Sequence, residues 1–145
     1  MNSEDTQAVA QRAVKVLLIS PFDEDHQHLR DLLKHSNWQQ YGARTQEESF
    51  ELLRANVTQV VICESELPDG GWQDVLAQLD RMQSPPLLVV TSRMADDRLW
   101  SEVLNLGGYN VLAKPLNMQE VFHVAGLAWM SWKGRWERPL LAQSA

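Results

Sequence analysis

The segment that decides the fold is Val14-Lys15-Val16-Leu17-Leu18-Ile19. It is rich in β-branched residues and almost wholly apolar, which is typical of a strand buried on both faces of a sheet. Two more runs of this kind follow, at residues 57–63 and 87–91. Strands of this type belong to parallel sheets that helices cover on both sides, so the sequence predicts an α/β fold.

Amphipathic segments alternate with these runs. The spacing of their apolar residues predicts five helices, and two weaker strands complete five strand–helix pairs. The helices are expected at 23–36, 47–56, 72–82, 95–106 and from 117 to at least 132, and the weaker strands at 39–44 and 109–113. Ligands of such sheets gather at the carboxyl ends of the strands. These ends are Ser20-Pro21, Glu64, Thr91-Ser92 and Lys114-Pro115.

The composition of the chain argues against several classes of protein. The chain has 145 residues and a net charge of −6, and an acidic chain of this kind does not favour nucleic-acid binding. Its one cysteine, Cys63, permits no internal disulfide, which favours the reducing cytoplasm. No apolar run approaches the roughly 20 residues of a membrane helix. We expect a loose leader at 1–12, one domain at 13–130, and a C-terminal extension at 131–145.

Four segments together resemble the receiver domains of two-component response regulators, of the type found in chemotaxis regulators. They are Val16–Ile19, Val60–Gly70 with its Leu-Pro turn, Val89–Ser92, and Gly107–Pro115 with its Gly-Gly and Lys-Pro pairs. The resemblance covers about residues 13–130. It implies a flavodoxin-like, doubly wound parallel sheet of five strands in the order 2-1-3-4-5 with five helices, and a role in a signalling phosphorelay.

The same resemblance implies a phosphorylation site whose key groups have changed. The phosphate-accepting aspartate of the family corresponds to Glu64, and the two acids that hold Mg²⁺ correspond to Ser20 and Pro21. Because Mg²⁺ prefers carboxylate ligands, we expect that no metal and no other cofactor binds, and that the chain is not phosphorylated. An alternative keeps a working site through Glu64 or through a shifted acidic loop that contains Asp23, Glu24 and Asp25.

Several switch positions of the family are retained. Thr91, Lys114 and Pro115 match it, whereas the aromatic switch residue corresponds to Val111. The resemblance places Lys114 beside Glu64. This pair either imitates part of the phosphorylated state or is a salt bridge that seals the end of the sheet.

Three tryptophans of the last helix, Trp129, Trp132 and Trp136, lie within a narrow arc. A helix over 117–136 would be about 30 Å long, whereas strands of ordinary length are about 17–20 Å long. We therefore expect the end bearing Trp132 and Trp136 to overhang the core and to form a protein interface.

These observations favour a cytoplasmic binding module that is not an enzyme. It would be a degenerate receiver that contacts a signalling protein, such as a histidine kinase or an output protein, and it could form a homodimer through the last helix. A flavodoxin-like electron carrier that binds FMN is a further alternative. The acidic loop after the first strand argues against it, because that loop would repel a phosphate.

Overall fold

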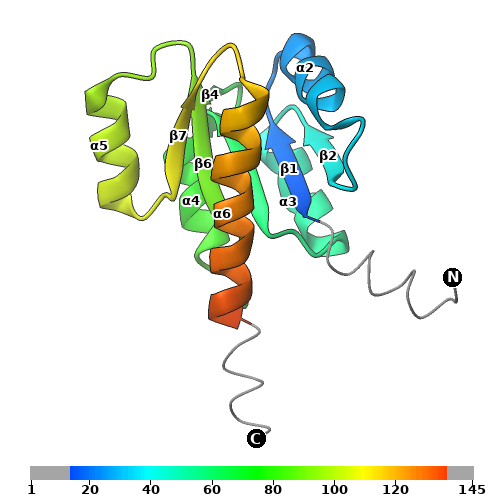
Figure 1. Cartoon of the computed structure of the whole chain (residues 1–145). Helices are drawn as coiled ribbons and strands as arrows, with labels where there is room; N and C mark the ends of the chain where they lie inside the picture. The colour runs from blue at the N-terminus through cyan, green and yellow to red at the C-terminus, as the bar shows by residue number, and fades with distance from the viewer. Residues whose placement is uncertain (1–13, 137–145) are drawn as a thin grey trace, which may run out of the picture.

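A computed structural model describes residues 14–136 (Figure 1). The elements follow the chain as β1 (Lys15–Ile19), α2 (Asp23–Leu33), β2 (Gln39–Ala43), α3 (Gln46–Ala55), β3 (Val60–Glu64), β4 (Glu66–Leu67), β5 (Gly70–Gly71), α4 (Trp72–Leu79), β6 (Leu87–Ser92), α5 (Asp97–Leu106), β7 (Asn110–Ala113) and α6 (Met118–Trp136). The predicted leader at 1–12 and the residues after 136 lie outside the described part. The predicted boundary at residue 130 falls inside α6.

The main sheet has the strand order β2-β1-β3-β6-β7, and all its pairings are parallel. This confirms the predicted α/β fold and the predicted order of its five main strands. Alternate residues of each strand face opposite sides of the sheet, so every central strand contributes to two cores. Leu18 and Ile62 face α2 and α6, whereas Leu17 and Val61 face α3, α4 and α5. Figure 1 shows the sheet between these two layers of helices.

The segment Leu67–Gly71, which contains the Leu-Pro turn, forms a small hairpin. Strands β4 and β5 pair antiparallel around Pro68 and Asp69, and Gly70 adopts a φ of +149° that favours glycine. The Asp69 carboxylate accepts hydrogen bonds from the backbone N–H groups of Gln46 (3.0 Å) and Glu47 (3.3 Å) at the start of α3. These bonds attach the hairpin to the N-terminus of α3, and the N-terminus is the end of a helix that attracts negative charge.

Helix α6 is longer than its sheet, as predicted, but its tryptophans do not form an exposed overhang. Trp132 is only 9% exposed and belongs to the core beneath α6. Its indole Nε1 lies 3.4 Å from the carbonyl oxygen of Ser84, in the loop that leads into β6. Trp129 and Trp136 are partly buried and pack against the same core. The expectation that Trp132 is exposed is therefore wrong, whereas a role of Trp129 and Trp136 in an interface stays a prediction.

The bounds of helices α2 and α6 differ from those expected from the sequence. Helix α2 begins at Asp23, and Phe22 occupies its N-cap position. Gly134 does not end α6, which continues to Trp136. Within residues 14–136 we find no helix of the length and apolar character that crossing a bilayer requires.

Candidate functional site

Three charged side chains meet at the carboxyl edge of the sheet. The Lys114 ammonium lies 2.7 Å from Glu64 Oε2 and 3.0 Å from Asp25 Oδ2. The three side chains are 5%, 9% and 10% exposed, respectively. They come from the segment after β7, the end of β3 and the first turn of α2. The predicted pairing of Lys114 with Glu64 is present, and Asp25 adds a second carboxylate to it.

Ser20 fixes the position of Asp25. Its hydroxyl donates a hydrogen bond of 2.7 Å to Asp25 Oδ2 and accepts one of 3.1 Å from the backbone N–H of Phe22. The His26 ring nitrogen Nε2 lies 2.8 Å from the Ser20 carbonyl oxygen. Ser20 is fully buried, so its hydroxyl serves the neighbouring carboxylate and is not open to solvent. Pro21 lines the adjacent cleft and supplies no side-chain oxygen there.

Asp25 is the member of this charged cluster that the sequence analysis does not place there. The sequence places Asp25 near the site only in the alternative that shifts the acidic loop. Its position follows from helix geometry without such a shift, because Asp25, Leu29 and Leu33 are spaced four residues apart and share the buried face of α2. A charged residue at the start of a buried apolar stripe was the available signal.

The residues present do not fit the Mg²⁺ site that the resemblance implies. Such a site uses several hard oxygen ligands, mainly carboxylates and water. Here the carboxylates of Asp25 and Glu64 both face an ammonium group, and the two positions after β1 hold Ser20 and Pro21. Within residues 14–136, no three His, Cys, Asp or Glu side chains are grouped so that they could hold a metal ion.

Burial and neighbouring charges shift the pKa values of the site residues in opposite directions. Burial raises the pKa of Glu64 above its ordinary value, and the contact with Lys114 offsets only part of this effect. Burial alone would lower the pKa of Lys114, but its contacts with Glu64 and Asp25 outweigh burial and raise it. The contacts of Lys114 therefore favour its cationic form, whereas burial makes the charged form of Glu64 costly.

We expect this cost to appear as a pH dependence of stability. A carboxyl group whose pKa is raised by folding stabilises the fold while protonated, and this contribution is lost as pH rises through the raised pKa. The wild-type chain should thus lose stability relative to a Glu64→Gln variant between the ordinary and the raised pKa of Glu64. Thermal melts of both proteins from pH 4 to pH 8 measure this, and parallel curves would contradict it.

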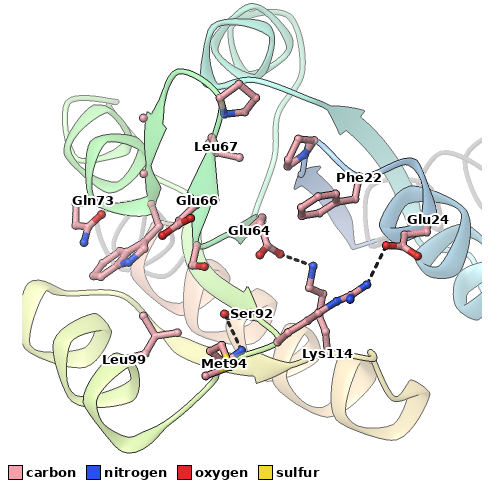
Figure 2. Close-up of a pocket in the computed structure, with 17 residues that line it drawn as sticks. Phe22, Glu24, Glu64, Glu66, Leu67, Gln73, Ser92, Met94, Leu99 and Lys114 are labelled. Atoms are coloured by element: carbon pink, nitrogen blue, oxygen red, sulfur yellow. Dashed lines mark hydrogen bonds and ion pairs between the residues drawn. The ribbon is translucent and has the colours of Figure 1, made fainter.

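A cleft of about 1120 Å³ opens above the charged cluster. In Figure 2, Glu64 and Lys114 lie at its base, and Phe22, Glu24, Leu67 and Met94 surround them. The Lys114 ammonium lies 4.8 Å from the centre of the Phe22 ring, which is a cation–π contact. An exposed ion pair of 3.0 Å joins Arg93 and Glu24, which both line the cleft. A screened surface pair of this kind contributes little stability.

The other predicted site residues occupy three different environments. Thr91 is fully buried and lies beside Glu64 in the sheet register. Its hydroxyl has no hydrogen-bond partner among residues 14–136. Val111 is 8% exposed and belongs to the core beneath α3, α4 and α5, so it fills space at the position of the aromatic switch. Pro115 follows Lys114 through a cis peptide bond and lines a second cavity, next to α2.

Cys63 precedes Glu64 but takes no part in the site. It is fully buried in the core, and burial raises the pKa of its thiol. The neighbouring Glu64 carboxylate raises it further. Since the thiolate is the reactive form, Cys63 is a core residue and not a nucleophile.

Comparison with solved structures identifies the fold. The receiver domain of an HD domain-containing protein from Pseudomonas fluorescens Pf-5 matches with a TM-score of 0.79 and 23% identity, over 88% of this chain and 94% of that one. The chain has the fold of a receiver domain. A two-component response regulator from Clostridium difficile matches with a TM-score of 0.72 and 22% identity, over 79% and 94% of the two chains.

A third match to the receiver fold is the beryllofluoride-activated NtrC4 receiver domain dimer. Its TM-score is 0.74 at 15% identity, and it covers 81% of this chain and 98% of that one. No family model and no curated protein matches the sequence. The likeness is therefore one of fold, shared over nearly the whole length of the solved domains.

Proposed function

We propose that this chain is a cytoplasmic signalling module of the receiver type that acts without phosphorylation and without catalysis, through contacts with another protein. The observation that supports it best is the ammonium group of Lys114, which contacts the carboxylates of both Asp25 and Glu64. The second observation that supports the proposal is the receiver fold of the chain.

The charge at the site disfavours an incoming phosphoryl group. Such a group carries about two negative charges at neutral pH and would approach two buried carboxylates with a single cation between them. Lys114 already forms ion pairs with both carboxylates and donates a hydrogen bond to Asp25. A phosphoryl group would have to break these contacts and would leave a buried charge without its partner, which is costly.

The same contacts hold one conformation. Lys114 joins the end of β7 to α2 and β3, so three elements at the carboxyl edge cannot separate without breaking a buried ion pair. A module fixed in this way presents the same surface at all times. The helix α5 offers a suitable contact surface, because Trp100 is 47% and Leu104 is 40% exposed.

Magnesium and beryllofluoride test the proposal directly. Trp72 lines the cleft, so we expect tryptophan fluorescence to change when a ligand binds there. We expect no saturable change when Mg²⁺ is added to millimolar concentration and beryllofluoride follows. The matched control is the double variant Pro21→Asp, Glu64→Asp, which returns a carboxylate to the loop and the shorter acid to β3. That variant should bind Mg²⁺ more tightly than the wild type.

A saturable response of the wild-type chain would contradict the proposal. It would favour the alternative in which Glu64 or the acidic loop forms a working phosphoacceptor site. A yellow protein with bound flavin after purification would favour the electron-carrier alternative instead. The Glu64→Gln variant separates these outcomes, because it should abolish a response at Glu64 but should leave flavin binding unchanged.

A further inference from the structure

The cleft at the carboxyl edge of the sheet carries more carboxylates than cations. Of the residues within 14–136 that line it, only Arg93 and Lys114 are cationic. Both are already engaged, because Arg93 is paired with Glu24 and Lys114 faces two carboxylates at once. The lining carboxylates are those of Glu24, Glu64 and Glu66, and Asp25, which contacts Lys114, adds a fourth. Negative charge therefore remains in excess in and beneath the cleft.

The Glu64 carboxylate at the base of the cleft lacks a hydrogen-bond donor. Its side chain is 9% exposed, and its Oε2 has no hydrogen-bond partner within residues 14–136. Lys114 Nζ lies 2.7 Å from this oxygen as an ion pair, but its hydrogen bond goes to Asp25. A buried acceptor without a donor is costly, and burial also raises the pKa of Glu64. A second cationic donor that enters from the cleft would supply the missing hydrogen bond and would favour the charged carboxylate.

The walls of the cleft suit a cation that is planar and carries an apolar stem. Phe22 is 46% exposed and Met94 is 77% exposed, and both line the cleft around Glu64 and Lys114 (Figure 2). The Phe22 ring already has the Lys114 ammonium 4.8 Å from its centre, so its position favours cations. A guanidinium group is planar, is more weakly hydrated than an ammonium group and stacks on aromatic rings. These properties favour arginine over lysine as the ligand of this cleft.

We propose that the cleft binds an arginine side chain of the partner protein, with the guanidinium group at Glu64 and the apolar stem along Phe22 and Met94. This inference rests on the proposed function, because it names the chemical group by which the partner is recognised. The cleft volume of about 1120 Å³ is larger than one side chain fills, so the residues that flank the arginine enter as well. The charge that disfavours a phosphoryl group at this place favours a guanidinium group for the same reason.

Calorimetric titration of the full chain with two short peptides tests the inference. One is a blocked pentapeptide with a central arginine between leucines, and the other carries citrulline, the neutral isostere of arginine, in its place. We expect a dissociation constant of about 1 mM or lower for the arginine peptide, and one about tenfold higher for the citrulline peptide. Glu64→Gln should weaken binding of the arginine peptide by about the same factor. The matched control is Glu51→Gln on α3, the same substitution at an exposed residue outside the cleft, which should leave binding unchanged.

Equal affinity for the arginine and citrulline peptides would overturn the inference, as would equal weakening by Glu64→Gln and Glu51→Gln. Agmatine, a free guanidinium compound, provides a further comparison. If agmatine binds as tightly as the arginine peptide, the cleft takes a small molecule and the assignment to a partner protein is wrong. Failure of the arginine peptide to bind, without any response to Mg²⁺ and beryllofluoride, would overturn this inference alone. A saturable response to Mg²⁺ and beryllofluoride would overturn the proposed function and this inference with it.

Discussion

Replacement of Lys114 by methionine is expected to lower the free energy of unfolding by about 3–5 kcal/mol, the usual consequence of removing one partner from a buried ion pair. Methionine keeps most of the length and apolar contact of the lysine side chain. The loss therefore comes from the two carboxylates, Asp25 and Glu64, which remain buried without a cation. Urea denaturation at pH 8, compared with the wild type, measures this change.

Two comparisons separate charge from packing in this experiment. Lowering the pH to 5 should reduce the loss, because buried carboxylates without a cation take up protons more readily when folded than when unfolded. A triple variant that adds Asp25→Asn and Glu64→Gln to Lys114→Met should recover part of the lost stability. If Lys114→Met unfolds at the same urea concentration as the wild type, the ion pairs do not stabilise the fold.

The sequence predicts two of the three charged residues of this site, because only these two lie at strand ends. Glu64 and Lys114 each follow an apolar strand, and parallel strands bring their carboxyl ends together. Asp25 lies on a helix, and its approach to Lys114 depends on how α2 rotates above the sheet. The hydrogen bond from Ser20 helps to fix that rotation. Such an angle depends on side-chain packing and cannot be obtained from strand order alone.

The fold itself could be predicted in more detail than the site. Continuous apolar runs predict the buried strands. The polar strand Gln39–Ala43 also lies where the sequence predicts it. The hairpin at Leu67–Gly71 was missed because strands of two residues leave no periodicity to detect. It is specified by tertiary contacts, among them those of the Asp69 carboxylate with the start of α3.

The tryptophans of α6 show a second limit of sequence reasoning. The comparison of the length of α6 with the length of the strands assumes that the core ends where the sheet ends. In the structure, the carbonyl oxygen of Ser84, in the loop before β6, lies 3.4 Å from the indole Nε1 of Trp132, which is only 9% exposed. A loop that packs in this way has no apolar pattern of its own. The aromatic stripe was therefore interpreted as an interface although Trp132 is a core residue.

Substitution of Trp132 by alanine should consequently destabilise the chain by about 3–5 kcal/mol, the usual loss for a large aromatic side chain in a core. The matched control is Trp100→Ala, the same substitution on a side chain that is 47% exposed, which should change stability by about 0.5 kcal/mol or less. Urea denaturation at low micromolar concentration, where self-association contributes least, compares the two. Equal losses at both positions would show that burial of Trp132 against Ser84 does not stabilise the fold. A large loss at Trp132 alone would make this end of α6 part of the domain and not a separate extension.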